Sequence, residues 1–176
     1  MAKKIPAVIL LVLVLASFTY AFTYAWWVTI EFKPDASEID HILISEIDKT
    51  WKTVKVLSMD AIPKEALESD PYDPIKEFGY IFSYVGDLNK DGIEDKAMVG
   101  VYEDTSGNFG RFLLVLTRSK KNWKMSFLSK IPGNPGFSIL WFNKGTLIWS
   151  VCMECGSHGE LRWDGKRYSV DWSKSN

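Results

Sequence analysis

The feature that most constrains the fold is a run of alternating apolar and polar residues between positions 80 and 172. A period of two is typical of β-strands with one buried face. Eight segments are expected to be strands: 80–85, 96–102, 111–118, 123–129, 137–142, 146–152, 160–163 and 167–172. Most of the links between them are short and contain Gly or Asn, as at 106–108, 121–122, 143–145 and 164–165. Links of this length join antiparallel neighbours, so the strands are expected to form an antiparallel meander.

Upstream of these strands, residues 37–52 are expected to form one amphipathic helix. Ser37 and Asp40 have the spacing of a capping box, and the apolar residues after Ser37 recur at helical spacing. These apolar residues are Ile39, Ile42, Leu43, Ile47 and Trp51. A short strand is expected at 53–59 and one helical turn at 64–69.

The chain of 176 residues suits one domain, and residues 31–176 are expected to form it. The predicted fold class is α+β, mainly β. The helix over 37–52 covers one face or end of about eight strands, which form either a curved sheet or a small barrel. The strand meander proper spans 110–172, and its Trp residues are expected to fill the core.

The first 30 residues predict export from the cytosol. Lys3 and Lys4 are the only charged residues before Glu31, and positive charge of this kind stays on the cytoplasmic side. The remainder of the chain is therefore expected on the periplasmic or exterior side of a membrane.

Two interpretations of this N-terminal segment remain open. As a cleaved signal peptide, its apolar region is 5–16, and cleavage follows Ala21 or Ala25. As a retained anchor, an uncharged run of about 26 residues is long enough to cross a bilayer. We favour the anchor, with an aromatic belt at the outer membrane interface made of Tyr20, Tyr24, Trp26 and Trp27. The alternative is a soluble secreted or periplasmic protein.

The most specific pattern is a short loop between the first two of the eight strands. Asp87, Asn89 and Asp91 occupy positions 1, 3 and 5 of this loop, and Gly92 follows at position 6. Alternate positions of a tight loop point inward, so these three side chains are expected to converge. Calcium binds six to eight oxygen ligands, and carboxylate and amide oxygens are among those it prefers. The pattern therefore predicts a calcium site.

Two further residues complete the predicted ligand set. The backbone carbonyl of Ile93 supplies another oxygen, and Asp95 closes the site. An EF-hand is excluded because its bidentate Glu at position 12 is Met98 here, and because strands rather than helices are expected on both sides. The site is therefore expected to be a calcium-binding β-hairpin over residues 78–102.

Residues 78–100 resemble one FG-GAP repeat, the integrin-type calcium unit related to VCBS repeats. The resemblance implies that the Asp and Asn side chains and one carbonyl of the loop hold Ca²⁺. Carried over to this chain, these ligands are Asp87, Asn89, Asp91, Ile93 and Asp95. The chain contains one such loop and is too short for a propeller, so the resemblance does not extend to the adhesion function of integrins.

A second candidate constellation contains both cysteines of the chain, Cys152 and Cys155, followed by His158. A c-type haem is excluded because Gly156, not His, follows the second Cys. A structural disulfide is favoured, because the domain is expected to be exported. Zinc held with a distant ligand such as His41, or a redox-active pair, remains an alternative.

Composition and motifs narrow the function. A sequence pI near 6.1 gives no general attraction to phosphate, so nucleic acid is not an expected partner. No nucleophile, phosphate-binding or metalloprotease motif is present, so the chain is not expected to be an enzyme. We expect a non-catalytic, calcium-stabilised extracytoplasmic domain that serves as an interaction or accessory subunit. The expected partner is a membrane-protein complex, reached through the anchor. The alternatives are a cell-envelope thiol-disulfide protein and a glycan-binding module with exposed Trp residues.

Overall fold

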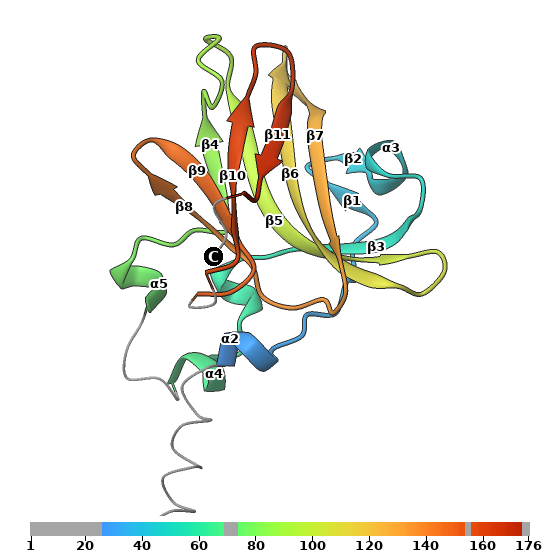
Figure 1. Cartoon of the computed structure of the whole chain (residues 1–176). Helices are drawn as coiled ribbons and strands as arrows, with labels where there is room; N and C mark the ends of the chain where they lie inside the picture. The colour runs from blue at the N-terminus through green and yellow to red at the C-terminus, as the bar shows by residue number, and fades with distance from the viewer. Residues whose placement is uncertain (1–25, 69–73, 154–155, 174–176) are drawn as a thin grey trace, which may run out of the picture.

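A computed structural model describes residues 26–68, 74–153 and 156–173 (Figure 1). The fold is mainly β, and its strands pair in antiparallel sheets. Two large sheets pack face to face, and a small hairpin with a short helix covers the outer face of one of them. The N-terminal segment before Trp26, including its expected signal or anchor, lies outside the described residues.

The larger sheet has five strands, and its two central strands are buried on both faces. Its strand order is β3 (Trp51–Val56), β5 (Asp95–Asp104), β6 (Phe109–Ser119) and β7 (Asn122–Pro132), with β4 (Ser83–Gly86) also paired to β5. Along β6, Leu113 and Leu114 point to opposite faces, and neither is exposed to solvent. The continuous apolar run of this strand therefore reflects a sheet covered on both sides.

The smaller sheet is an uninterrupted meander of four strands. In order of pairing these are β11 (Tyr168–Asp171), β10 (His158–Trp163), β9 (Thr146–Ser150) and β8 (Ile139–Asn143). Its inner face packs on the larger sheet and forms the main core, in which Trp149 is fully buried. Val99 and Val115 of the larger sheet and Ile139 of the smaller sheet belong to the same core.

The eight predicted strands are confirmed, because each overlaps one of the strands β4 to β11. The prediction that they form one curved sheet or a small barrel is wrong, since the described strands divide into separate sheets and close no barrel. The division falls at the end of β7, whose last residue is Pro132 and which is followed by Gly133 and Pro135. Proline has no N–H to donate to a strand ladder, so pairing stops there and the chain crosses to the other sheet.

The predicted helix over 37–52 is wrong. This segment forms β1 (Glu38–Ile39), β2 (Ile42–Leu43), the one-turn helix α3 (Ile44–Ile47) and the start of β3. Asp40 and His41 both have positive φ angles, 48° and 66°, which form a tight turn and cannot continue a helix. The Asp40 carboxylate also accepts hydrogen bonds from Lys96 at 2.7 and 2.8 Å, which fixes the turn on β5.

The apolar residues of this segment are nevertheless buried together. They form a second core on the outer face of the larger sheet, against Phe112 and Leu114 of β6. The members contributed by this segment are Ile39, Ile44, Ile47 and Trp51. The spacing of the apolar residues therefore predicted correctly that they are buried, but it did not predict the hairpin and one-turn helix on which they lie.

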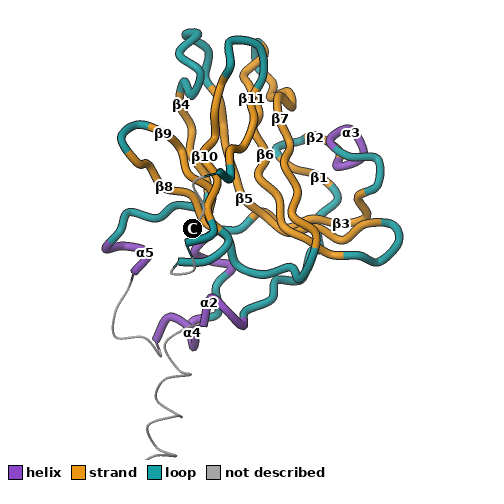
Figure 2. The backbone as a smooth tube through the Cα atoms, in the orientation of Figure 1, coloured by secondary structure: helices purple, strands orange, loops and turns teal. Residues whose placement is uncertain are grey.

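Short helices gather beside the sandwich, mostly at one end (Figure 2). They are α2 (Trp26–Thr29), the 3₁₀ helix η1 (Met59–Ala61), α4 (Lys64–Glu68) and α5 (Pro74–Glu77). Trp26 and Trp27 are buried in the main core, and Trp26 meets Phe137 edge-on at 5.3 Å. Their expected place in a membrane-interface belt is therefore wrong. Within the described residues, no helix combines the length and apolar character needed to cross a membrane.

Burial on both faces of β6 gives a test of the three-layer arrangement. We expect Leu113→Ala and Leu114→Ala each to lower the free energy of unfolding by about 2–5 kcal/mol, because each leaves a cavity in a different core. Urea denaturation followed by circular dichroism measures this. Met125→Ala on β7, at 36% exposure, is the control and is expected to cost far less. A near-neutral effect at either Leu would contradict the covered sheet.

Candidate functional site

The predicted calcium loop joins two paired antiparallel strands, as expected for a β-hairpin. Gly86 at the end of β4 pairs with Asp95 at the start of β5, and the intervening residues form the connecting loop. The loop extends beyond the sheet beside the β10–β11 hairpin of the other sheet (Figure 1). It therefore lies where the ends of both sheets meet.

The first two candidate side chains turn toward the same backbone amide. The N–H of Asp91 donates to Asp87 Oδ1 at 3.0 Å and to Asn89 Oδ1 at 3.1 Å. The other oxygen of Asp87 accepts from the N–H of Gly92 at 2.9 Å. Side chains of positions 1 and 3 thus converge inside the loop, as the spacing predicts.

The third candidate side chain, Asp91, also lies against the loop. Its Oδ1 accepts from the N–H of Ile93 at 2.8 Å, and its Oδ2 accepts from Asn89 Nδ2 at 2.9 Å. The φ angle of Gly92 is 83°, a left-handed conformation that a residue without a Cβ adopts at little cost. The glycine of the motif is therefore required by the backbone of the turn.

Asp95 differs from the other candidates because its carboxylate is fully buried. Its Oδ2 accepts from the Tyr168 hydroxyl at 2.6 Å and from the N–H of Leu88 at 3.2 Å, and its Oδ1 accepts from the Thr117 hydroxyl at 2.5 Å. These donors come from β11, the loop and β6. The structure thus places Asp95 as an anchor between the loop and both sheets.

Sequence reasoning did not find Tyr168 or Thr117. Tyr168 is 73 positions from Asp95 along the chain, and neither residue belongs to a recognisable motif. The only sequence signal is the Asp itself, an acidic residue just before the apolar run 97–101 of its strand. Such a residue needs buried partners, but the sequence does not say which.

The acidic residues of the loop affect the pKa of the buried Tyr168 hydroxyl. Burial raises the pKa of the Tyr168 hydroxyl well above its ordinary value of 10.0, and the hydrogen bond to Asp95 raises it further. The charges of Asp95, Asp91 and Asp87 act in the same direction. The three acidic groups of the motif therefore act together on one buried phenol.

The donor chemistry of the loop suits a hard cation such as Ca²⁺. Asp87, Asn89 and Asp91 each turn a side-chain oxygen toward the backbone of the turn, and the Ile93 carbonyl is the further oxygen expected from the sequence. Asp95 is already bound by three donors, so its expected role as a closing ligand is the weakest part of the set. Across 26–68, 74–153 and 156–173, no three His, Cys, Asp or Glu side chains form a metal-binding group.

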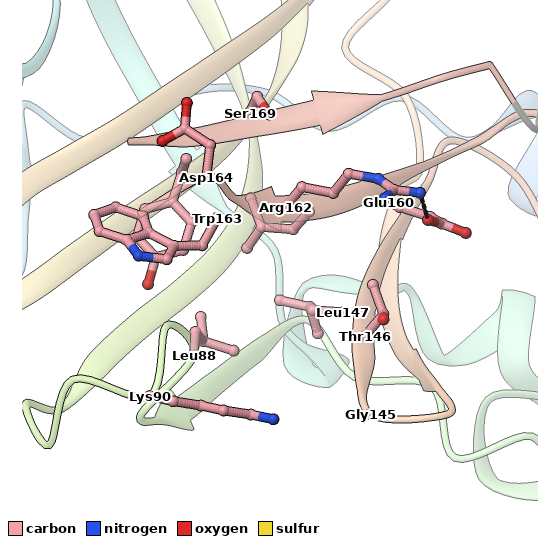
Figure 3. A pocket seen from close by; sticks show the side chains of 12 residues that line it. Leu88, Lys90, Gly145, Thr146, Leu147, Glu160, Arg162, Trp163, Asp164 and Ser169 are labelled. Atoms are coloured by element: carbon pink, nitrogen blue, oxygen red, sulfur yellow. Dashed lines mark hydrogen bonds and ion pairs between the residues drawn. The ribbon is translucent and has the colours of Figure 1, made fainter. Parts of the chain in front are cut away.

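A pocket of about 430 Å³ borders the loop (Figure 3). Leu88 and Lys90 line it from the loop, and Trp163 lines it from the β10–β11 hairpin. Trp163 is 38% exposed, whereas the other seven Trp residues are buried or half-buried. The structure therefore presents one exposed indole at a pocket and not a row of them.

The cysteine constellation is only partly described. Cys152 follows β9, His158 begins β10, and Cys155 lies outside the described residues. The disulfide therefore stays a prediction. His41, the distant candidate for zinc, is 97% exposed on the turn between β1 and β2, which covers the opposite face of the larger sheet. The structure thus does not bring His41 to Cys152.

No family model matches the chain, and no curated protein or solved structure matches it either. The arguments about function below therefore depend on the residues and their geometry.

Loss of the Tyr168 hydroxyl tests the anchoring role of Asp95. We expect Tyr168→Phe to lower the free energy of unfolding by about 1.5–3 kcal/mol, since the hydrogen bond has a charged acceptor. Chemical denaturation measures it. Tyr84→Phe is the matched control, because the Tyr84 hydroxyl has no hydrogen-bond partner among the described residues, and it is expected to stay within about 0.5 kcal/mol. Equal effects in the two variants would contradict the anchor.

The raised pKa of Tyr168 predicts a dependence of stability on alkaline pH. Above pH 10.0 the unfolded chain loses the Tyr168 proton while the folded protein keeps it. The unfolded state then binds fewer protons, so the free energy of unfolding falls by about 1.4 kcal/mol per pH unit from this group. Denaturation of wild type and Tyr168→Phe between about pH 8 and pH 11 measures the difference, since other tyrosines titrate in both. Parallel curves would show that Tyr168 does not contribute.

Proposed function

We propose that this chain is a non-catalytic, calcium-stabilised extracytoplasmic domain that serves as an interaction or accessory subunit. Its calcium ligands are Asp87, Asn89, Asp91 and the Ile93 carbonyl, with Asp95 closing the site at the base of the loop. The N-terminal segment anchors the domain to a membrane, as expected from Lys3 and Lys4 and the uncharged run that follows them.

The observation that carries the proposal is the convergence of Asp87 and Asn89 on one amide, with Asp91 folded against the same turn. Asp87 and Asp91 are exposed side chains of like charge, and both accept hydrogen bonds from backbone amides of the same short turn. A divalent cation between them offsets their repulsion and replaces weak backbone contacts with ion–oxygen contacts. The ion therefore stabilises the hairpin.

The connection through Asp95 extends this stabilisation to the whole sandwich. Leu88, within the loop, donates its N–H to Asp95, and Asp95 accepts from Tyr168 of the other sheet. An ordered loop keeps Leu88 in place and so keeps Asp95 paired. Extracellular calcium modules bind in the range of about 10⁻⁴–10⁻³ M, which suits the proposed location outside the cytosol.

The thiol-disulfide alternative depends on Cys152 and Cys155. A disulfide between them would close the β9–β10 connection, where the Ser150 hydroxyl lies 3.1 Å from the Ser157 carbonyl oxygen and also contacts that of Cys152. Such a connection suits a structural role. We therefore keep the disulfide within the leading proposal and redox activity as the alternative to it.

Calcium titration is the direct experiment. About 10 mM Ca²⁺ is expected to stabilise the protein by about 1.4–2.7 kcal/mol for dissociation constants of about 10⁻³–10⁻⁴ M. For a chain of this size this corresponds to a rise in melting temperature of about 3–10 °C. Differential scanning fluorimetry after chelator treatment measures the shift, with Mg²⁺ as the competing ion.

The matched variants are Asp87→Asn, Asp91→Asn and, as control, Asp104→Asn. Asp104 accepts the N–H groups of Ser106 and Asn108 at 2.8 Å in the β5–β6 turn, so it has a similar local role outside the proposed site. We expect the first two variants to abolish the calcium shift and the control to retain it. A melting temperature that does not change up to about 10 mM Ca²⁺ would overturn the proposal.

A further inference from the structure

The pocket beside the loop has walls from four separate elements, one of which is β11 with Tyr168 and Ser169. Leu88 and Lys90 come from the β4–β5 loop, Thr146 comes from the start of β9, and Trp163 comes from the end of β10. Figure 3 shows the two loop residues on the side of the pocket opposite Trp163 and Asp164. Because elements of both sheets enclose it, the pocket is a feature of the assembled sandwich.

The loop presents alternate residues to different surroundings. Asp87, Asn89 and Asp91 turn toward the backbone of the loop, whereas Leu88 and Lys90 line the pocket. The side chains of successive loop residues alternate in direction. The residues with oxygen ligands therefore face the loop, and the residues between them form one wall of the pocket. In this one respect the inference rests on the proposed function, because a calcium-ordered loop fixes that wall.

The wall opposite the loop is aromatic and held in place. The Trp163 ring packs on the ring of Tyr168, with 4.8 Å between centroids, and Tyr168 is itself buried and bonded to Asp95. The indole thus keeps its orientation while remaining 38% exposed. A fixed and partly exposed indole offers an apolar face next to polar groups.

The charged groups around the pocket are balanced and mostly paired. Arg162 forms ion pairs with Glu160 at 2.5 Å and Asp171 at 3.0 Å. Asp164 accepts the N–H groups of its own turn, from Lys166 and Arg167, at 2.8 and 2.9 Å. The lining thus has two basic residues, Lys90 and Arg162, and two acidic ones, Glu160 and Asp164. The lining therefore offers oriented hydrogen-bond donors and acceptors, and its formal charges sum to zero.

We infer that this pocket binds a neutral pyranose sugar of one or two rings. The C–H face of such a ring packs on Trp163, with Leu88 and Leu147 as further apolar surface. The ring hydroxyls find donors and acceptors in Arg162, Glu160 and Thr146. The volume of about 430 Å³ lies toward the lower end of known ligand pockets, which suits a small ligand. Because the basic and acidic residues of the lining are equal in number, the pocket does not favour a charged ligand.

The test is saturation-transfer NMR on the full chain with calcium present. The probes are glucose, galactose, mannose, N-acetylglucosamine, cellobiose and diacetylchitobiose, each at about 10 mM to detect millimolar affinity. We expect transfer to at least one of these sugars. Trp163→Ala is expected to weaken its binding about tenfold or more.

Two further variants make the test specific. Phe109→Ala removes an aromatic side chain of similar exposure, 39%, that lies outside the pocket, and it is expected to keep binding. Thr146→Trp fills the pocket while leaving Trp163 in place, and it is expected to lose binding. Circular dichroism and melting temperature verify the fold of each variant.

The inference would be overturned by no saturation transfer to any of the six sugars, or by equal transfer from wild type and from Trp163→Ala. The melting temperature of the same samples with and without calcium separates this result from the proposed function. If sugar binding depends on Trp163 but calcium does not change the melting temperature, the sugar site stands and the calcium proposal fails. If calcium raises the melting temperature but no sugar binds, the calcium proposal stands and the sugar site fails.

Discussion

The buried carboxylate of Asp95 is the interaction on which the arrangement of this end of the molecule depends. A buried charge without partners is very unfavourable, so the fold must supply donors to it. The donors come from Leu88 in the loop, Thr117 on β6 and Tyr168 on β11. Apolar packing between the two sheets is non-directional, whereas these hydrogen bonds fix how the loop and the β10–β11 hairpin meet.

The hydrogen bonds of Asp95 also explain why the candidate site and the pocket lie next to each other. Asp95 holds Leu88 through its N–H, and Leu88 lies between two of the residues whose oxygens turn into the loop. Asp95 also holds Tyr168, on which Trp163 packs. Both walls of the pocket are therefore attached to one carboxylate. The properties we propose for the loop and for the pocket are thus linked through the hydrogen bonds of Asp95 to Leu88 and Tyr168.

The sequence predicts the strands well because their signal is local. Each of the strands β4 to β11 overlaps a predicted segment, since alternation and turn residues act over a few positions. The prediction of a helix over 37–52 is wrong because a two-residue turn at Asp40 and His41 interrupts the segment. The spacing of its apolar residues is compatible with a short hairpin as well as with a helix. Which strands share a sheet depends on the prolines after β7 and on the packing of both faces of β6. Pairs such as Asp95 and Tyr168 are long-range, so sequence patterns do not reveal them.

The placement of these features also bears on how an anchored domain would meet its surroundings. The described chain begins with α2 at one end of the sandwich, beside α4, whereas the β4–β5 loop and the tip of the β10–β11 hairpin lie at the other end (Figure 1). Trp26 and Trp27 of α2 are buried in the core, so this end of the described chain is held by packing against the sandwich. We propose an anchor before Trp26, and the described part of the chain begins at the end of the sandwich opposite the loop and the pocket (Figure 1). If the domain is joined to a membrane from the α2 end, the loop and the pocket stay open to the ions and sugars that we propose as their ligands.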